Sequence, residues 1–290
     1  MNKFKTGILF VGLFLAPAAA LLAGDEVLAV ISSDSDHYKE ALKGFQDSYG
    51  TAPVVNVQAQ KPVINDKTRV VVAFGGKAAL QDYKGVPVLI CMAPSVNVKE
   101  ISSSTKKVYV PMTPRARVLL RQLKELQPSL KRLAVFWASE SLRDYIGEMK
   151  ESATAIGIEL VPVYITDPAA LPQRLRELQG KADALLLPPD PSLVSSHNFT
   201  TIKDFSWANH VPFYAPTEGL VAKGATASIS TNFRQIGEYV AKVARQMADG
   251  VPVSDVMYVE DVFITLSASA AEHTNLSVPP AMDSRIQSLP

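Results

Sequence analysis

The middle of the chain, residues 130–191, alternates short apolar runs with longer amphipathic segments. The apolar runs lie at 133–137, 158–163 and 182–187, and between them apolar residues recur every three or four positions. Apolar strands of about five residues that alternate with helices are typical of a parallel sheet covered on both faces. We therefore predict an open α/β sheet, whose ligand would bind beyond the carboxyl ends of the strands.

The same alternation continues on both sides of this stretch. Further strands are predicted at 26–31, 54–57, 69–74, 86–92, 108–110, 212–214 and 226–230, with one or two more in 257–266. Further helices are predicted at 38–50, 77–83, 114–128, 192–209 and 233–249. About ten strands are better divided between two sheets of ordinary size than placed in one wide sheet. We place the first crossing between the two halves near residues 128–131.

One crossover lacks its helix. Residues 58–68 contain Pro62, Asn65 and Asp66 but no helical periodicity, although they join two predicted parallel strands. Part of the first sheet would then be covered by this loop or by a partner protein.

The N-terminus has the pattern of a secretory signal. Lys3 and Lys5 precede an apolar run at 7–15 and small residues at 16–20, which is the order of a cleavable signal peptide. Cleavage is expected after Ala20 or Ala23, which predicts an exported, periplasmic protein. An uncleaved anchor is the alternative, although the apolar core is short for a membrane span.

Composition narrows the function classes. The chain has 290 residues and a net charge of +1, which gives no reason to expect a nucleic-acid partner. The single cysteine, Cys91, excludes an internal disulfide, and the four histidines have no metal-ligand spacing. We expect no metal and no cofactor. Gly75-Gly76-Lys77 lacks the other residues of a phosphate loop, and no nucleophile elbow is present, so an exported hydrolase or isomerase is the weaker alternative.

From residue 121 onward, several motifs occur in a characteristic order. They are LQPSLKRLAV at 126–135, AIGIEL at 155–160, DALLLPPD at 183–190, VPFYA at 211–215, VAKGA at 221–225 and IG at 236–237. In this order and spacing the chain resembles the ABC transporter substrate-binding family whose better-known members bind tryptophan or tyrosine. That family belongs to the type I periplasmic binding proteins.

The resemblance implies two doubly wound parallel-sheet lobes joined by hinge crossovers, with the ligand held between them. With the predicted signal peptide placed at 1–23, it implies an N-terminal lobe from 24–130 plus 232–252 and a C-terminal lobe from 131–231 plus 253–290. The sequence departs from the family pattern at the short 58–68 stretch. It also has Ser-Thr-Asn-Phe at 230–233, where members usually have a Gly-Val-Asp-Tyr type of run.

Candidate ligand contacts lie at the predicted strand ends and helix starts, where free N–H groups favour an anionic ligand group. Each polar candidate has a second interpretation as a helix cap. Asp190 and Glu218 match acidic positions of the motifs and would suit an ammonium group, whereas Trp137 is either core or a stacking platform. The predicted ligand-binding residues are Ser32, Ser33, Asp34, Gly75, Gly76, Trp137, Ser139, Glu140, Asp190, Thr217 and Glu218.

Two functions remain open at this point. The first is an exported, monomeric solute-binding protein that takes an amino acid-like molecule, aromatic or branched, to an ABC permease and its ATPase. The second is a periplasmic sensor or adaptor on the same fold, which presents a ligand to a receptor or simply binds a partner protein. Neither is an enzyme.

Overall fold

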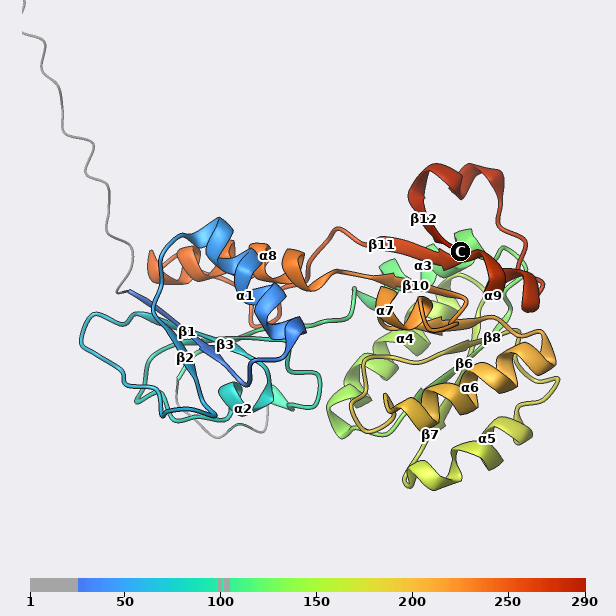
Figure 1. Ribbon diagram of the computed structural model, residues 1–290, viewed down its shortest axis with the longest axis horizontal. Coiled ribbons are helices and arrows are strands. Elements are labelled where there is room, and N and C mark those ends of the chain that lie inside the picture. Colours follow the sequence, from blue (N-terminus) through green and yellow to red (C-terminus); the bar gives the residue numbers. More distant parts are fainter. Residues whose placement is uncertain (1–25, 99–100, 102–104) are drawn as a thin grey trace, which may run out of the picture.

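The computed structural model describes residues 26–98, 101 and 105–290 and shows two lobes side by side, each built around one sheet (Figure 1). The predicted signal segment, 1–23, lies outside the described residues. No helix of the described chain combines the length and the apolar character needed to span a bilayer.

The first lobe contains a five-stranded parallel sheet with the order β2-β1-β3-β4-β5. Its central strands are buried on both faces because every residue of β1 and β3 is apolar and covered. The elements are β1 (Val27–Ile31), α1 (Asp36–Tyr49), β2 (Val54–Asn56), β3 (Val70–Phe74), α2 (Gly76–Ala79), β4 (Val88–Cys91), β5 (Lys107–Val110) and, much later in the chain, α8 (Phe233–Ala248).

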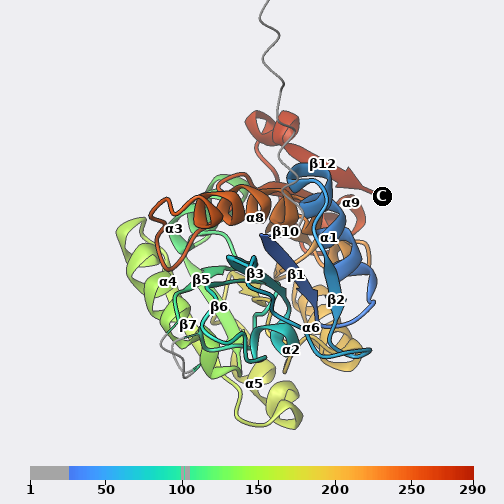
Figure 2. The same ribbon diagram turned by 90° about the vertical axis from the view of Figure 1, so that its left-hand side faces the viewer.

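The two faces of this sheet are covered differently. Helices α1 and α8 lie together on one face, whereas on the opposite face the described residues form only the short α2 and connecting loops (Figure 2). The helices approach closely because Gly44 and Gly237 leave room for backbone: a Cβ on Gly237 would overlap the carbonyl oxygen of Ala41. As the sequence predicts, residues 58–68 contain no helix.

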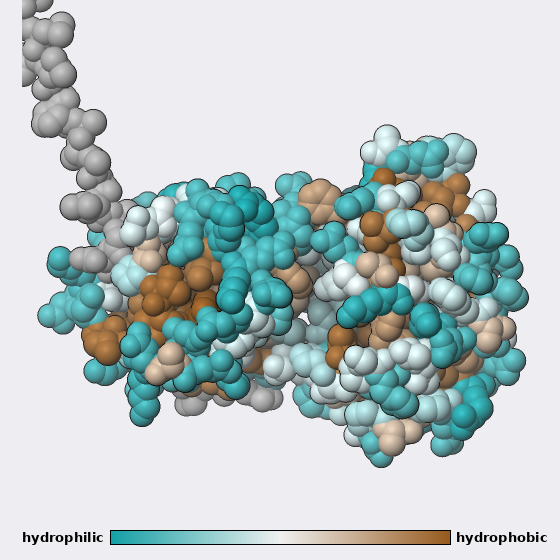
Figure 3. Space-filling model, viewed as in Figure 1, coloured by the Kyte–Doolittle hydropathy of each residue, from teal (hydrophilic) through white to brown (hydrophobic). Residues whose placement is uncertain are grey.

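The loop-covered face leaves apolar side chains in contact with solvent. Val63, in the loop between β2 and β3, is 80% exposed. Figure 3 shows hydrophobic surface gathered on this lobe (left-hand side). A hollow of about 180 Å³ lies beside Val63 and is lined partly by Leu28, Pro53 and Val55.

The second lobe contains a seven-stranded sheet with the order β12-β11-β10-β9-β8-β6-β7, parallel except between β10 and β11. Helices cover both faces, α3, α4 and α9 on one and α5 and α6 on the other. The elements are α3 (Ala116–Leu126), β6 (Arg132–Trp137), α4 (Arg143–Ala155), β7 (Glu159–Tyr164), α5 (Leu171–Glu177), β8 (Ala184–Leu186), α6 (Ser196–Asn209), β9 (Phe213–Ala215), α7 (Glu218–Val221), β10 (Ala227–Ser230), β11 (Phe263–Ser267), α9 (Ala268–His273) and β12 (Ile286–Leu289). Short 3₁₀ turns lie at Glu140–Leu142, Pro168–Ala170 and Pro280–Arg285.

The described chain passes between the lobes in segments 111–115, 231–232 and 249–262. The first crossing therefore lies earlier than the predicted 128–131, because Leu120 and Leu123 of α3 pack in the same core as Leu133 of the second sheet. Residues 253–259 also differ from the predicted division. They run along β5, where the N–H of Tyr109 donates to the carbonyl of Asp255 at 2.8 Å. Amphipathic pattern marks a helix but does not tell which sheet it covers.

Candidate functional site

A cavity of about 590 Å³, here called the interlobe cavity, lies between the two lobes. Its walls come from the segment between β4 and β5, from the start of α4 and from two of the crossing segments. Small-molecule sites typically have volumes of roughly 300–1,000 Å³, mostly apolar walls and a few polar groups. The lining residues are Pro94, Val96, Asn97, Val98, Ile101, Thr105, Lys106, Lys107, Tyr109, Pro111, Met112, Thr113, Ser141, Leu142, Asp144, Tyr145, Glu148, Pro189, Asp255, Val256 and Tyr258.

Tyrosines from both lobes and from a crossing segment face this cavity. The hydroxyl of Tyr145 donates to the carbonyl of Pro114 at 2.9 Å, and that of Tyr109 lies 3.4 Å from the carbonyl of Ala93. Burial raises the pKa of Tyr109, Tyr145 and Tyr258 above the usual value. All three are therefore neutral phenols at physiological pH, able to donate a hydrogen bond and to pack against an apolar group.

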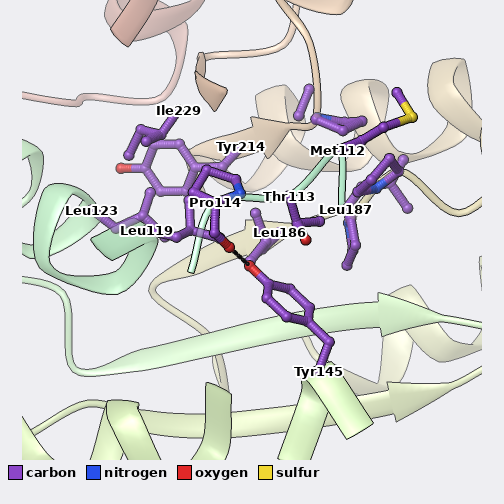
Figure 4. Close-up of a pocket in the computed structure, with 14 residues that line it drawn as sticks. Met112, Thr113, Pro114, Leu119, Leu123, Tyr145, Leu186, Leu187, Tyr214 and Ile229 are labelled. Carbon is purple, nitrogen blue, oxygen red and sulfur yellow. Dashed lines mark hydrogen bonds between the residues drawn. The ribbon is translucent and has the colours of Figure 1, made fainter. Parts of the chain in front are cut away.

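A smaller apolar hollow of about 20 Å³ lies next to the interlobe cavity, at the carboxyl ends of β8 and β9 (Figure 4). It shares Met112, Thr113, Tyr145 and Pro189 with the larger cavity. Figure 4 shows the Tyr145 hydroxyl pointing at Pro114, so the first crossing segment is tied to α4 at this place. The hollow has room for about one water molecule and is too small for a solute.

A hollow of about 230 Å³ lies beside the second crossing segment. Thr217 and Glu218, both predicted from sequence, line it, together with Glu40 of the first lobe. Its wall includes Thr231, which is 6% exposed and whose hydroxyl has no hydrogen-bond partner among the described residues. The lining residues include no lysine, arginine or histidine, so this hollow is acidic.

Asp190, predicted as a ligand contact, is fully buried and holds two strand ends together. Its carboxylate accepts hydrogen bonds from the backbone N–H groups of Ala138 at 2.6 Å, Ser139 at 2.8 Å and Ser192 at 3.0 Å. The Ser139 hydroxyl donates at 2.5 Å. A carboxylate with four donors and no exposed surface joins the loops after β6 and β8, and it leaves the Ser139 hydroxyl engaged as well.

Trp137 and Glu140 belong to one cluster on the second lobe. Trp137 is 7% exposed, which favours the core interpretation, and its ring lies 4.4 Å from that of Tyr164. Glu140 accepts from Arg143 at 2.7 and 2.8 Å and from the Tyr164 hydroxyl at 2.7 Å. Hydrogen bonds from Arg143, then from Tyr164, hold the pKa of Glu140 below its usual value.

The candidates on the first lobe make local structure. The Ser32 hydroxyl accepts from the N–H of Ala78 at 3.0 Å and is buried, so it caps α2. Gly75 has φ of +96°, and a Cβ there would overlap the hydroxyls of Ser32 and Tyr38. Ser33 donates to Ser35 at 3.2 Å. Asp34 is exposed, and Gly76 begins α2.

The structure therefore gathers the predicted residues into separate groups. Thr217 and Glu218 line the acidic hollow, Trp137, Ser139, Glu140 and Asp190 gather at the ends of β6 and β8, and the remaining five lie around α2 and the start of α1. None of the eleven lines the interlobe cavity. The described residues also contain no group of three or more His, Cys, Asp or Glu side chains placed to hold a metal ion.

Comparisons with known proteins identify the family of the chain and match its fold. A family model described as ABC transporter substrate binding protein matches residues 33–279. A tyrosine-binding protein of Clostridioides difficile is 23% identical over 222 residues, and the match spans 73% of this chain but 64% of that protein's length.

Solved structures share the fold. One is an ABC domain from Streptococcus pneumonia in complex with L-Trp, with a TM-score of 0.65, 17% identity and coverage of 90% of this chain and 99% of that one. Another is the ligand-free, open form of a substrate-binding protein with adhesive properties from Clostridium difficile, with a TM-score of 0.66, 19% identity and coverage of 91% and 98%.

Proposed function

Because the chain belongs to the ABC transporter substrate-binding protein family, we propose that it captures a small amphipathic solute between its lobes and delivers it to an ABC permease. The solute is amino acid-like, with an aromatic or branched apolar part. The observation that carries this proposal is the interlobe cavity of about 590 Å³, whose walls come from both lobes. A ligand that contacts both lobes favours whichever arrangement lets both contacts form.

The cavity walls support this solute class. Apolar residues such as Val96, Met112 and Leu142 would cover an apolar side chain, and the phenols of Tyr109 and Tyr258 would pack against a ring. The crossing segments at 111–113 and 255–258 form part of the wall, so a bound solute lies directly against the hinge. Hinge closure around a ligand is a common transition in two-lobed binding proteins.

Export is part of the proposal. Lys3, Lys5 and the apolar run at 7–15 support a cleaved signal peptide, and delivery to a permease requires the protein outside the cytoplasm. N-terminal sequencing should show that the mature protein begins between Leu21 and Asp25. Membrane-bound protein that keeps residues 1–20 would contradict cleavage.

A thermal-shift screen tests solute binding. Aromatic and branched amino acids come first, followed by short peptides and other amphipathic carboxylates. Ligand at a hundred times its dissociation constant should stabilise the fold by about 2.7 kcal/mol. For a chain of this size, that raises the melting temperature by about 5–10 °C. Small-angle scattering with a hit should show a more compact particle. No shift and no compaction with any compound would contradict the proposal.

Two variants then identify the hollow that holds the solute. Tyr258→Phe removes a hydroxyl from the interlobe cavity and should weaken binding by about 0.5–1.5 kcal/mol. Glu218→Gln alters only the acidic hollow and should leave affinity unchanged. A loss of about 1.5–3 kcal/mol in Glu218→Gln would place the solute's ammonium group at Glu218 instead, as the sequence predicts.

The second candidate is a sensor or adaptor on the same fold. The observation that favours it is the loop-covered face of the first lobe, where Val63 is 80% exposed. Neighbouring genes for a permease and an ATPase would support transport, whereas a histidine kinase gene would support the sensor.

A further inference from the structure

The charged residues that line the described part of the interlobe cavity are distributed unevenly between the two lobes. Asp144 and Glu148 lie four residues apart on α4, so they share one face of that helix and form an acidic wall on the second lobe. Lys106 and Lys107 lie across the cavity, at the start of β5 on the first lobe. Asp255 lies on the lysine side and offsets part of its charge.

The lysines make hydrogen bonds that leave their charge uncompensated. The Lys106 ammonium donates to the carbonyl of Val253 at 3.1 Å, and the Lys107 ammonium donates to the carbonyl of Ile101 at 2.5 Å. Both acceptors are neutral. Among the ion pairs of the described residues, none includes Lys106, Lys107 or Glu148.

Neutral polar groups lie between the two charged walls. The Tyr258 hydroxyl forms no hydrogen bond with the described residues, although its ring is held under the Arg115 guanidinium at 4.5 Å. Arg115 in turn pairs with Glu260 at 3.3 Å. The ring is thus fixed in the wall while its hydroxyl stays available to a ligand.

Resting on the proposed function, we propose that the solute is an extended zwitterion whose ammonium end is held at Glu148 and whose carboxylate end is held at Lys106 and Lys107. An α-amino acid carries both charges on one carbon and therefore places both ends near one wall. A short peptide carries its charges at opposite ends, which suits charged groups that lie on opposite walls. Because each end attracts a different lobe, such a solute favours the arrangement in which both walls reach it.

The test uses four compounds that differ only in their charged ends or their length. Alanyl-phenylalanine has both ends, its N-acetyl form lacks the ammonium, its amide lacks the carboxylate, and phenylalanine has both charges on one carbon. Calorimetry should give alanyl-phenylalanine an affinity about tenfold to a hundredfold higher than that of each modified dipeptide, the effect of one charge-assisted hydrogen bond. Phenylalanine should bind about as weakly as the modified forms.

Variants assign each end to its wall. Glu148→Gln should lower the affinity for alanyl-phenylalanine about tenfold or more. It should leave the affinity for the N-acetyl form unchanged, because that form has no ammonium group for Glu148 to bind. The double variant Lys106→Met, Lys107→Met should lower the affinity for the dipeptide by a similar factor but leave the affinity for its amide unchanged. The matched controls are Glu151→Gln on α4 and Lys84→Met on the first lobe, both exposed and outside the cavity, which should bind as wild type does.

The outcomes separate this inference from the proposed function. If phenylalanine or either modified dipeptide binds as tightly as alanyl-phenylalanine, the solute class is overturned while solute binding stands. The same holds if the dipeptide is inert and the wider screen finds another ligand. If no compound of either set binds, both proposals fail.

Discussion

Long helices cover both faces of the seven-stranded sheet, whereas the five-stranded sheet has long helices on one face and, among the described residues, only the short α2 on the other. The two walls of the interlobe cavity differ in the same way. Its wall on the second lobe comes largely from a helix, α4, packed on a buried sheet, while its wall on the first lobe comes largely from the described loop residues 94–98, 101 and 105–106. Loops tolerate rearrangement better than packed helices do. We therefore expect α4 to fix the position of a solute and the loop wall to adapt to its shape.

The largest loss of stability is expected when the connection between the ends of β6 and β8 is removed. Asp190→Ala removes a buried carboxylate and leaves its four donors unsatisfied, so the free energy of unfolding should fall by about 3–5 kcal/mol. Urea unfolding followed by circular dichroism measures it. Asp167→Ala, which removes one exposed cap on the same lobe, is the control and should cost about 1 kcal/mol. Equal losses would show that Asp190 does not join the loops.

The next effect tests the helix-covered face of the first lobe. Gly237→Ala places a Cβ against the Ala41 carbonyl and should destabilise the protein by about 1–3 kcal/mol, the usual range for overpacking. Gly147→Ala, in the exposed part of α4, is the matched control. Its Cβ meets no atom within 4 Å, and it should stabilise by about 0.5–1 kcal/mol. Thermal unfolding of both variants measures these changes in stability. If Gly237→Ala is as stable as wild type, α1 and α8 separate easily to make room for the added Cβ.

An intermediate effect depends on pH and belongs to the second lobe alone. Burial raises the pKa of Asp183, but hydrogen bonds from the Arg132 side chain and from the N–H groups of Arg132 and Lys131 outweigh it and hold that pKa below the usual value. A lowered folded-state pKa gives stability above the unfolded pKa of about 3.9, which is lost as the pH falls through the folded-state pKa. Wild type should therefore lose more stability than Asp183→Asn between pH 6 and about pH 3 in urea titrations. Parallel pH profiles would rule out this contribution.

The smallest expected effect concerns the loop-covered face. Val63→Ser changes a residue that is 80% exposed and should alter the free energy of unfolding by less than about 0.5 kcal/mol. Val135→Ala, fully buried in the second lobe, should cost about 2 kcal/mol by comparison. A large loss in Val63→Ser would mean that the loop packs more tightly than its exposure indicates.

The sequence predicts most of the fold because its signals are local. Apolar runs such as 133–137 and 226–230 became strands, and the capping residue Asn232 and its partner Gln235 mark the start of α8. The terminal strand β12 was not predicted, since Ile286 and Leu289 are its only apolar residues and it follows a proline-containing turn. Its pairing with β11 is a tertiary effect.

The site was harder to predict because its residues are remote in sequence. Tyr109, Tyr145 and Tyr258 come from a strand, a helix and a crossing segment, and no spacing connects them. Asp190 was placed correctly at a strand end, but such a position suits a structural carboxylate as well as a ligand contact. Only the four surrounding donors decide between the two.

The late position of α8 in the chain has a consequence for biogenesis. The core of the first lobe includes Ile236, Val240 and Ala244 of that helix, so this lobe has no complete core until nearly the whole chain has been synthesised. The second lobe, by contrast, is supplied mainly by a continuous stretch from α3 to β10. Domains tend to fold as units during synthesis. The part of the protein that is made first therefore waits for α8, so β1 and β3 lack a covering helix that is supplied only after residue 233.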